Sequence, residues 1–249
     1  FEDILDDLLT VFKHFNRNKA HIVGLSMGGQ IATLFYEKYP SYVKSLILCD
    51  THFGLSNLDP KEVDKFINLR KEPLINGKEP RDIAPIVAST LIGDINNKSA
   101  YEELVDSMEL LHKESYLKTI ETSMRTEHRH VFKTINVPTF IMVGELDTLT
   151  PPSMSREIMK EIKESSLAII PNAGHLINIE NPKEFNQMKI DTSGELTGVG
   201  IQIQKDEKSV YLIIVSPIEG TPAYNAGIKA KDKILSIDGI STKGMTLDD

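Results

Sequence analysis

Three residue types that together perform nucleophilic catalysis follow one another along the chain in the order serine, aspartate, histidine. Ser26 lies in the pattern Gly24-Leu25-Ser26-Met27-Gly28-Gly29, Asp147 lies in a loop after a predicted strand and before a predicted helix, and His175 ends the run Asn172-Ala173-Gly174-His175. A serine hydroxyl is a weak nucleophile at neutral pH and needs a base within hydrogen-bond reach, itself oriented by a carboxylate. Ser26, Asp147 and His175 are therefore the candidate catalytic set.

The pattern around Ser26 predicts a strand, a tight turn and a helix. An apolar run over residues 22–25 precedes the serine, and a helix-favouring segment over residues 30–39 follows it. In that setting the serine is expected at the apex of the turn, with its hydroxyl exposed. Such a turn needs small residues at positions 24, 28 and 29, because a side chain there would collide with the neighbouring strand or helix.

Two other carboxylates compete for the role of the acid. Asp50 also follows a predicted strand and is an alternative, but Asp147 is favoured by its turn-rich loop before a helix. Both Asp147 and His175 follow strands, where ligands and chemistry collect in open parallel sheets. For Glu145 we expect a structural or solvated role.

The remaining histidines give a weaker signal. We expect His14, His21, His112, His128 and His130 to be solvated, since they lie among charged residues on predicted helices or turns. His52 follows a strand, and either a place in the pocket or a plain loop role is open. His128 and His130 have no Cys, Asp or further His at ligand spacing. We therefore expect no metal and no cofactor.

The elements that must position these residues alternate between strand and helix. A helical pattern over residues 1–12 precedes the strand at 22–25, and a second apolar strand occupies residues 43–49. Short links between such elements predict a parallel sheet covered on both faces, and hence an α/β fold. Residues 51–129 contain helical stretches separated by breakers such as Glu72-Pro73, which predicts a helical insertion over the sheet. Strands then resume over residues 137–144 and 167–170.

Composition narrows the function classes. The 249 residues are 40% hydrophobic, with a net charge of -8, which is typical of a soluble globular protein of one or two domains. The acidic balance argues against nucleic acid as a partner. No apolar run approaches the ~20 residues of a membrane span. The single cysteine, Cys49, rules out an internal disulfide.

The amino-acid composition and the expected secondary structure change in the last quarter of the chain. Beyond Asn186 the sequence is rich in Thr, Ser and Gly, and strands are expected over residues 199–203, 210–215 and 233–237. Nothing there continues the alternation of strand and helix. We therefore predict a domain over residues 1–186 and a small, mostly β domain over residues 187–249.

At the three motifs the chain resembles the α/β-hydrolase superfamily, most closely its esterase and enol-lactonase-like branch. The motifs are G-L-S-M-G-G after H-I-V, V-P-T-F-I-M-V-G-E-L-D-T-L-T-P-P and I-P-N-A-G-H-L-I-N-I-E-N-P. The resemblance implies Ser26 as nucleophile, Asp147 as orienting acid, His175 as general base and the Met27 N–H as half of the oxyanion hole. It also implies that residues 51–129 form a lid, that the substrate is a small carboxylic ester or lactone, and that the cytoplasm is the favoured compartment.

One departure from that family affects the expected activity. Its members carry about four strands ahead of the nucleophile, and a loop among them supplies the second oxyanion donor, whereas this sequence begins on the preceding helix. The expectation is an N-terminally truncated hydrolase. A missing oxyanion donor costs roughly two to three orders of magnitude in turnover. An uncovered apolar strand at residues 22–25 also favours aggregation.

Residues 187–249 resemble the PDZ domain of carboxyl-terminal processing peptidases. The resemblance is carried by I-D-T-S-G-E-L-T-G-V-G-I, I-E-G-T-P-A and D-K-I-L-S-I-D-G. It implies a partial, peptide-binding PDZ fold in which Gly198, Val199, Gly200 and Ile201 receive a peptide's terminal carboxylate and pair with it by strand addition. That family works outside the cytoplasm. The alternative function is thus a peptide-binding PDZ module fused to an inert hydrolase fragment.

The junction between the two regions suggests a hypothesis about their origin. The stretch Asn181-Pro182-Lys183-Glu184-Phe185-Asn186 suits both families. We therefore hypothesise a splice of two partial genes, produced by recombination or by sequence assembly. Independent reads that cross residues 175–200 within one genome, with full-length flanks, would exclude it.

Overall fold

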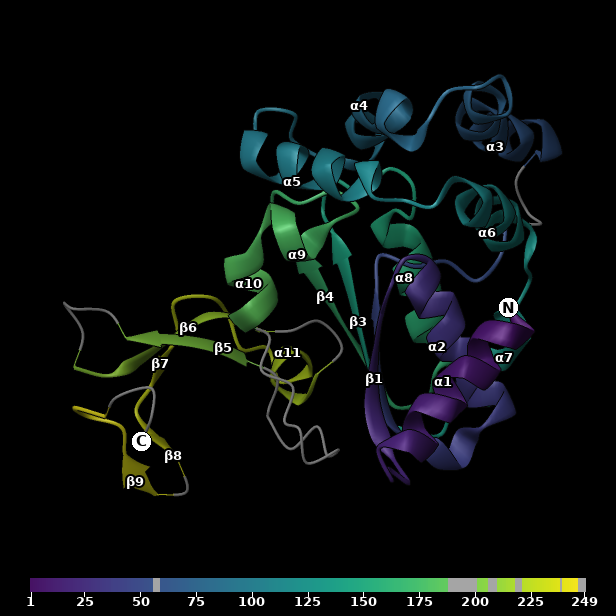
Figure 1. Ribbon diagram of the computed structural model, residues 1–249. Helices are drawn as coiled ribbons and strands as arrows, with labels where there is room; N and C mark the ends of the chain where they lie inside the picture. The colour runs from purple at the N-terminus through teal and green to yellow at the C-terminus, as the bar shows by residue number, and fades with distance from the viewer. Residues whose placement is uncertain (56–58, 188–200, 206–209, 218–220, 238, 246–249) are drawn as a thin grey trace.

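The computed structural model describes residues 1–55, 59–187, 201–205, 210–217, 221–237 and 239–245 (Figure 1). Up to residue 187 the strands are β1 (Ala20–Leu25), β2 (Val43–Cys49), β3 (Thr139–Gly144) and β4 (Ser165–Ile170). The helices are α1 (Glu2–His14), α2 (Met27–Lys38), η1 (Pro40–Tyr42), α3 (Pro60–Ile75), α4 (Pro80–Leu91), α5 (Lys98–Glu109), α6 (Lys113–Arg125), α7 (Arg129–Phe132), α8 (Pro152–Glu161), α9 (Ile177–Glu180) and α10 (Pro182–Gln187).

The four strands form one parallel sheet in the order β1-β2-β3-β4. Their last residues are in register: Leu25 lies opposite Cys49, Cys49 opposite Met142, and Gly144 opposite Ile170. The loops that follow β1, β2, β3 and β4 therefore leave the same edge of the sheet. This confirms the predicted α/β class.

Each face of the sheet is covered by helices (Figure 1). On one face, Leu46 and Ile141 pack with residues of α1, α2 and α8, among them Phe35 and Ile158. On the other face, the core includes Ile177 of α9, with Phe185 of α10 packed against it. Strands β2 and β3 are buried on both sides, which explains their continuous apolar sequences.

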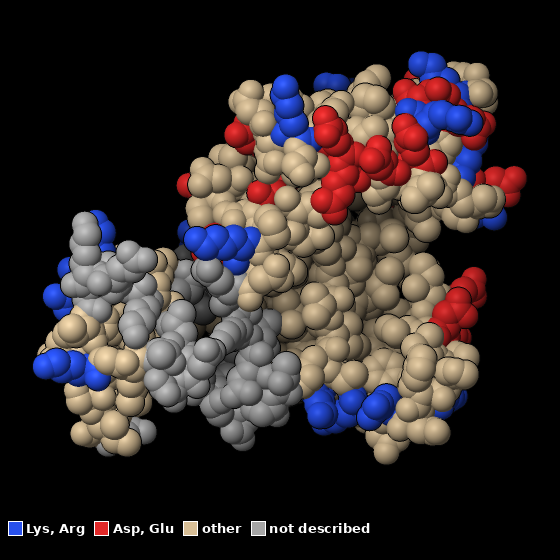
Figure 2. All heavy atoms as spheres, turned by 60° about the vertical axis from the view of Figure 1, so that its left-hand side comes forward, with Lys and Arg blue, Asp and Glu red and all other residues tan. Residues whose placement is uncertain are grey.

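Helices α3 to α6 form the helical insertion, which lies above the carboxyl ends of β3 and β4 (Figure 1). The surface is hollowed below these helices (Figure 2). Helices α4 and α5 share a core of their own, built from residues such as Val87 and Leu104. The prediction that Glu72-Pro73 ends a helix is wrong. Helix α3 continues to Ile75, because burial of Leu74 offsets the hydrogen bond lost at Pro73.

Strand β1 lies at the edge of the described sheet. Among the described residues it pairs with β2 alone. The residues of β1 are therefore less buried than those of β2, and Val23 is 58% exposed. The apolar sequence of β1 is thus only partly covered by the described residues.

The described part of the last quarter is mostly β. Its elements are β5 (Ile201–Lys205), β6 (Leu212–Pro217), α11 (Pro222–Asn225), β7 (Lys233–Ile234), β8 (Ser236–Ile237) and β9 (Ile240–Ser241). All of these strands pair in antiparallel fashion, and the mostly β character of this part agrees with the prediction. Of the proposed peptide-binding residues, Ile201 begins β5, and Gly198, Val199 and Gly200 lie outside the described residues. None of the helices in the described ranges combines the length and apolarity that a membrane crossing requires.

Candidate active site

Ser26 occupies a strained turn between β1 and α2. Its φ of 54° lies in the left-handed region, which a residue with a side chain enters only when its surroundings hold it there. The Ser26 N–H donates to the carbonyl of Cys49 at 2.8 Å. The hydroxyl of Thr51 donates to the Ser26 carbonyl, also at 2.8 Å. The last residue of β2 and the loop just after it therefore hold both the N–H and the carbonyl of Ser26.

Two of the three neighbouring glycines are required for space. A Cβ on Gly24 would lie 2.2 Å from the Gly28 carbonyl oxygen, and a Cβ on Gly29 would lie 2.6 Å from the Thr51 side chain. At Gly28 a Cβ would meet nothing within 4 Å. The expected collision at Gly28 is therefore wrong, because the first turn of α2 leaves that position facing open space.

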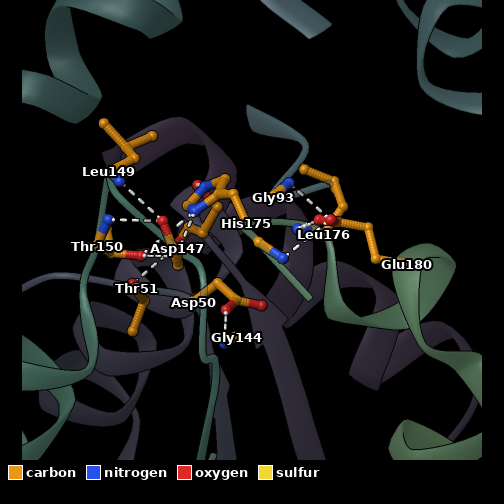
Figure 3. Close-up of polar contacts among 12 residues, drawn as sticks. Asp50, Thr51, Gly93, Gly144, Asp147, Leu149, Thr150, His175, Leu176 and Glu180 are labelled. Carbon is orange, nitrogen blue, oxygen red and sulfur yellow. Dashed lines mark hydrogen bonds and ion pairs between the residues drawn. The ribbon is translucent and has the colours of Figure 1, made fainter. Parts of the chain in front are cut away.

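The side chain of His175 contacts Ser26 through one ring nitrogen and Asp147 through the other, and Figure 3 shows His175 beside Asp147. Its Nε2 is 2.8 Å from the Ser26 Oγ, and its Nδ1 is 2.9 Å from the Asp147 Oδ2. A carboxylate oxygen only accepts, so Nδ1 carries the proton and Nε2 is left to accept from the serine hydroxyl. His175 and Asp147 are 4% and 3% exposed. The structure thus brings together three side chains that are far apart in the sequence.

The carboxylate of Asp147 is held by its own loop. Its Oδ1 accepts the N–H groups of Leu149 and Thr150 at 2.8 and 3.0 Å, and its Oδ2 accepts the Thr150 hydroxyl at 2.6 Å. Burial alone would raise the pKa of Asp147, but the hydrogen bonds from His175 and Thr150 hold that pKa below its usual value. Sequence reasoning missed Thr150. The spacing D-x-x-T, which suits an Asx turn, is the signal that could have found it.

The two rival carboxylates lie elsewhere. Asp50 is fully buried, its Oδ1 accepts the Gly144 N–H at 2.9 Å, and burial raises the pKa of its carboxyl well above the usual value. Glu145 is exposed and accepts the N–H of Asn172, a structural contact. Asp147 is the carboxylate that contacts the Nδ1 of His175.

Two histidines are buried beside α2. His52 accepts the Gly54 N–H at Nδ1, and its Nε2 lies 2.6 Å from the Gln30 amide. Burial lowers the pKa of His52 to about 3. The expectation that His128 is solvated is wrong: it is fully buried against Phe132, and burial lowers its pKa. Over the described ranges, no group of three or more His, Cys, Asp or Glu could hold a metal ion.

Two further features flank the serine and the aspartate. Met27 is the first residue of α2, and the first N–H groups of a helix have no partner within it. A cavity of about 720 Å³ lies between α3, α6 and the loop after β3, and Thr148 and Leu149 form part of its wall. The remaining wall is largely apolar and includes Phe66 and Met124.

Comparison with protein families divides the chain into two matches. A family model for the alpha/beta hydrolase fold matches residues 1–182. A family model for the PDZ domain matches residues 187–249. Both resemblances seen in the sequence are confirmed.

Individual relatives follow the same division. The chain is 27% identical over 187 residues to monoacylglycerol lipase ABHD6 of Mus musculus, covering 71% of this chain and 55% of the lipase. It is 37% identical over 101 residues to a carboxyl-terminal-processing protease of Picosynechococcus, covering 41% of this chain and 24% of the protease. A solved thermophilic esterase from Thermogutta terrifontis superposes with a TM-score of 0.65 at 25% identity, covering 74% of this chain and 68% of the esterase. The chain thus spans about half the length of the lipase and a quarter of that of the protease.

Proposed function

This chain belongs to the α/β-hydrolase fold family, and from that premise we propose that it hydrolyses a carboxylic ester or lactone through an acyl-enzyme. Ser26 is the nucleophile, His175 the general base and Asp147 the orienting acid. The observation that carries the proposal is the continuous pair of hydrogen bonds from the Ser26 hydroxyl through the imidazole to the Asp147 carboxylate.

In the first half-reaction the Ser26 Oγ attacks the substrate carbonyl carbon, and the hydroxyl proton moves to Nε2 of His175. The imidazolium that forms is stabilised by Asp147, which stays ionised because its hydrogen bonds keep its pKa low. The tetrahedral intermediate carries its negative charge on the former carbonyl oxygen. The Met27 N–H at the start of α2 donates to that oxygen.

The intermediate collapses when the bond to the leaving oxygen breaks and Nε2 returns its proton to that oxygen. An ester releases an alcohol, whereas a lactone opens and its hydroxyl stays on the bound acyl group. A water molecule then attacks the acyl-enzyme with His175 again as base. The acid is released and the Ser26 hydroxyl is restored.

The cavity beside the Asp147 loop supports a substrate with an apolar part. Its wall includes Leu149, whose N–H holds the carboxylate of Asp147, and side chains such as Phe66 and Met124. Burial of apolar surface there contributes about 25 cal/mol per Å². The lipase and esterase names among the relatives agree with ester chemistry, which is proposed for this chain.

A fluorophosphonate probe tests this function directly, because it forms a covalent bond only with an activated serine. We expect labelling at Ser26, identified by peptide mass, and its loss in Ser26→Ala. Ser107→Ala, at an exposed position of α5, is the matched control and should label like the unchanged chain. Absence of labelling at Ser26 in folded protein would overturn the proposal, and turnover of p-nitrophenyl esters would then measure only background.

A second function is favoured by the PDZ match over residues 187–249 and by the similarity to the protease. In this alternative, the last quarter binds a peptide through its terminal carboxylate, and the hydrolase region is passive. Binding of a labelled peptide with a free carboxylate, but not of its amide, would support it. Equal binding of the two peptides would count against carboxylate recognition.

A further inference from the structure

The buried carboxylate of Glu180, at the end of α9, accepts three backbone N–H groups from two separate segments. Its Oε2 accepts the N–H of Gly174 at 2.9 Å and that of Gly93 at 2.8 Å, and its Oε1 accepts the N–H of Leu176 at 3.0 Å. Figure 3 shows Gly93, Leu176 and Glu180 on the side of His175 away from Asp147. Glu180 therefore holds the residues on both sides of the imidazole-bearing residue.

The N–H of His175 itself is held by the helical insertion. It donates at 2.9 Å to the carbonyl of Leu91, the last residue of α4. Three successive N–H groups, those of residues 174–176, are thus bonded either to Glu180 or to the end of α4. The backbone that carries the imidazole has no free N–H at this point.

The two segments also touch through their backbones. A Cβ on Gly93 would lie 2.7 Å from the Gly174 nitrogen, and a Cβ on Gly174 would lie 2.3 Å from the Gly93 nitrogen. Leu176 packs against the core shared by α4 and α5. The Asn97 side chain donates to the main-chain carbonyl of Glu180 at 3.0 Å. The α4–α5 loop (residues 92–97) is therefore joined to the loop that carries His175 (the histidine loop, residues 171–176) by a side-chain hydrogen bond, by backbone contact and by packing.

We propose that Glu180 is a positioning residue for His175, and that through it the α4–α5 loop of the helical insertion and the imidazole form one mechanical unit. This inference rests on the proposed serine hydrolase function. A shift of the α4–α5 loop that breaks the Gly93 bond moves the same carboxylate oxygen that holds Gly174. Such a shift therefore displaces Nε2 from the Ser26 hydroxyl.

Glu180→Gln tests the proposal with little change in side-chain size. The amide has one oxygen, which accepts at most two of the three N–H groups, and without the negative charge the remaining bonds to Gly93 and Gly174 are weaker than those to a carboxylate. Because misplacement of a reacting group by about 1 Å costs about 100-fold, we expect the maximal rate of fluorophosphonate labelling to fall about tenfold to 100-fold. The probe's half-saturating concentration should change by less than about twofold, because the apolar cavity is untouched. Glu184→Gln, in the next helix, is the matched control and should keep the original rate.

Amide hydrogen exchange supplies a readout that needs no activity. In Glu180→Gln, exchange should rise together in the peptides that contain Gly93 and Gly174–Leu176, and Glu184→Gln should leave both unchanged. Faster exchange in the histidine loop alone, or an unchanged labelling rate in a chain that labels at Ser26, overturns the proposal. If the unchanged chain does not label at Ser26, the proposed hydrolase function is wrong. The exchange result still tests whether the α4–α5 loop and the histidine loop are coupled. Should Glu180→Gln not fold, Glu180→Asp keeps the carboxylate on a shorter stem and is measured in the same way.

Discussion

The Nδ1 of His175 lies 2.9 Å from the Oδ2 of Asp147, on the loop after β3. The rival carboxylate, Asp50, follows β2 and is bonded to the Gly144 N–H below that loop. The two aspartates have opposite electrostatic surroundings. Hydrogen bonds keep the pKa of Asp147 low although burial alone would raise it, whereas burial raises the pKa of Asp50 well above its usual value. Only a carboxylate that stays ionised can stabilise an imidazolium.

The first prediction separates the two aspartates. Asp147→Asn should lower the rate of labelling at Ser26 about 10³- to 10⁴-fold, because an amide facing Nδ1 favours the wrong imidazole tautomer. Asp50→Asn should change it less than about tenfold, since Asn keeps an oxygen for the Gly144 N–H. Labelling rates at pH 7.5 measure both. A larger loss in Asp50→Asn than in Asp147→Asn would reverse the assignment.

The second prediction concerns stability below neutral pH. Burial lowers the pKa of His52 to about 3 and also lowers that of His128, so in acid both take up protons only in the unfolded chain. Each histidine therefore reduces the free energy of unfolding by up to about 1.4 kcal/mol per pH unit below about pH 6.5. Asp50 acts in the opposite sense, because its raised pKa keeps it protonated in the folded chain where the unfolded carboxyl is ionised.

Urea unfolding at several pH values from 4.5 to 6.5 measures this balance. The free energy of unfolding should fall as the pH falls, and the slope should be steeper in Asp50→Asn, which removes the opposing group. Asn186→Ala is the control, since that exposed side chain carries no titratable group, and it should keep the original slope. A shallower slope in Asp50→Asn would show that the sign given to Asp50 is wrong.

Much of the fold follows from local pattern. The near-continuous apolar sequences of β2 and β3 are those of strands buried on both faces, and the short links between elements impose parallel pairing. The order of Ser26, Asp147 and His175 along the chain then places all three at the carboxyl ends of strands, and the structure brings their side chains together. Their chemical roles stay predictions.

Other features depend on contacts that no local pattern contains. His128 is buried because α7 brings it against Phe132 and His52, and four residues of helix carry too little periodicity to reveal this. The Glu180 carboxylate meets Gly93, 87 positions away. Pro73 lies inside α3 because the packing of its neighbour Leu74 outweighs a local preference. The burial of His128 and the continuation of α3 through Pro73 are cases in which tertiary packing overrides sequence propensity.

The third prediction uses two glycines of the serine turn as a matched pair. Gly24→Ala places a Cβ 2.2 Å from the Gly28 carbonyl oxygen and should lower the free energy of unfolding by at least about 2 kcal/mol. Gly28→Ala meets nothing within 4 Å, and alanine favours helix, so stability should change by no more than about 1 kcal/mol. Urea unfolding at pH 7.5 measures both. Equal losses in the two variants would contradict the described turn.

The fourth prediction concerns the exposed edge of the sheet. Val23 of β1 is 58% exposed, and among the described residues β1 pairs only with β2. An apolar strand edge with unpaired backbone groups templates association, and lysine on an edge strand opposes it. Val23→Lys should therefore slow the concentration-dependent rise in light scattering. The rate of Ser26 labelling by the monomer should be unchanged, since the substitution leaves the bonds of the serine turn in place.

Val11→Lys separates the effect of the edge from that of charge. Val11 lies on α1, is 50% exposed, and the same substitution there changes the net charge equally. If association proceeds through β1, Val11→Lys should scatter light like the unchanged chain, and only Val23→Lys should remain monomeric at higher concentration. Equal protection by both variants would mean that net charge controls association, and that the edge of β1 is not where the chains meet.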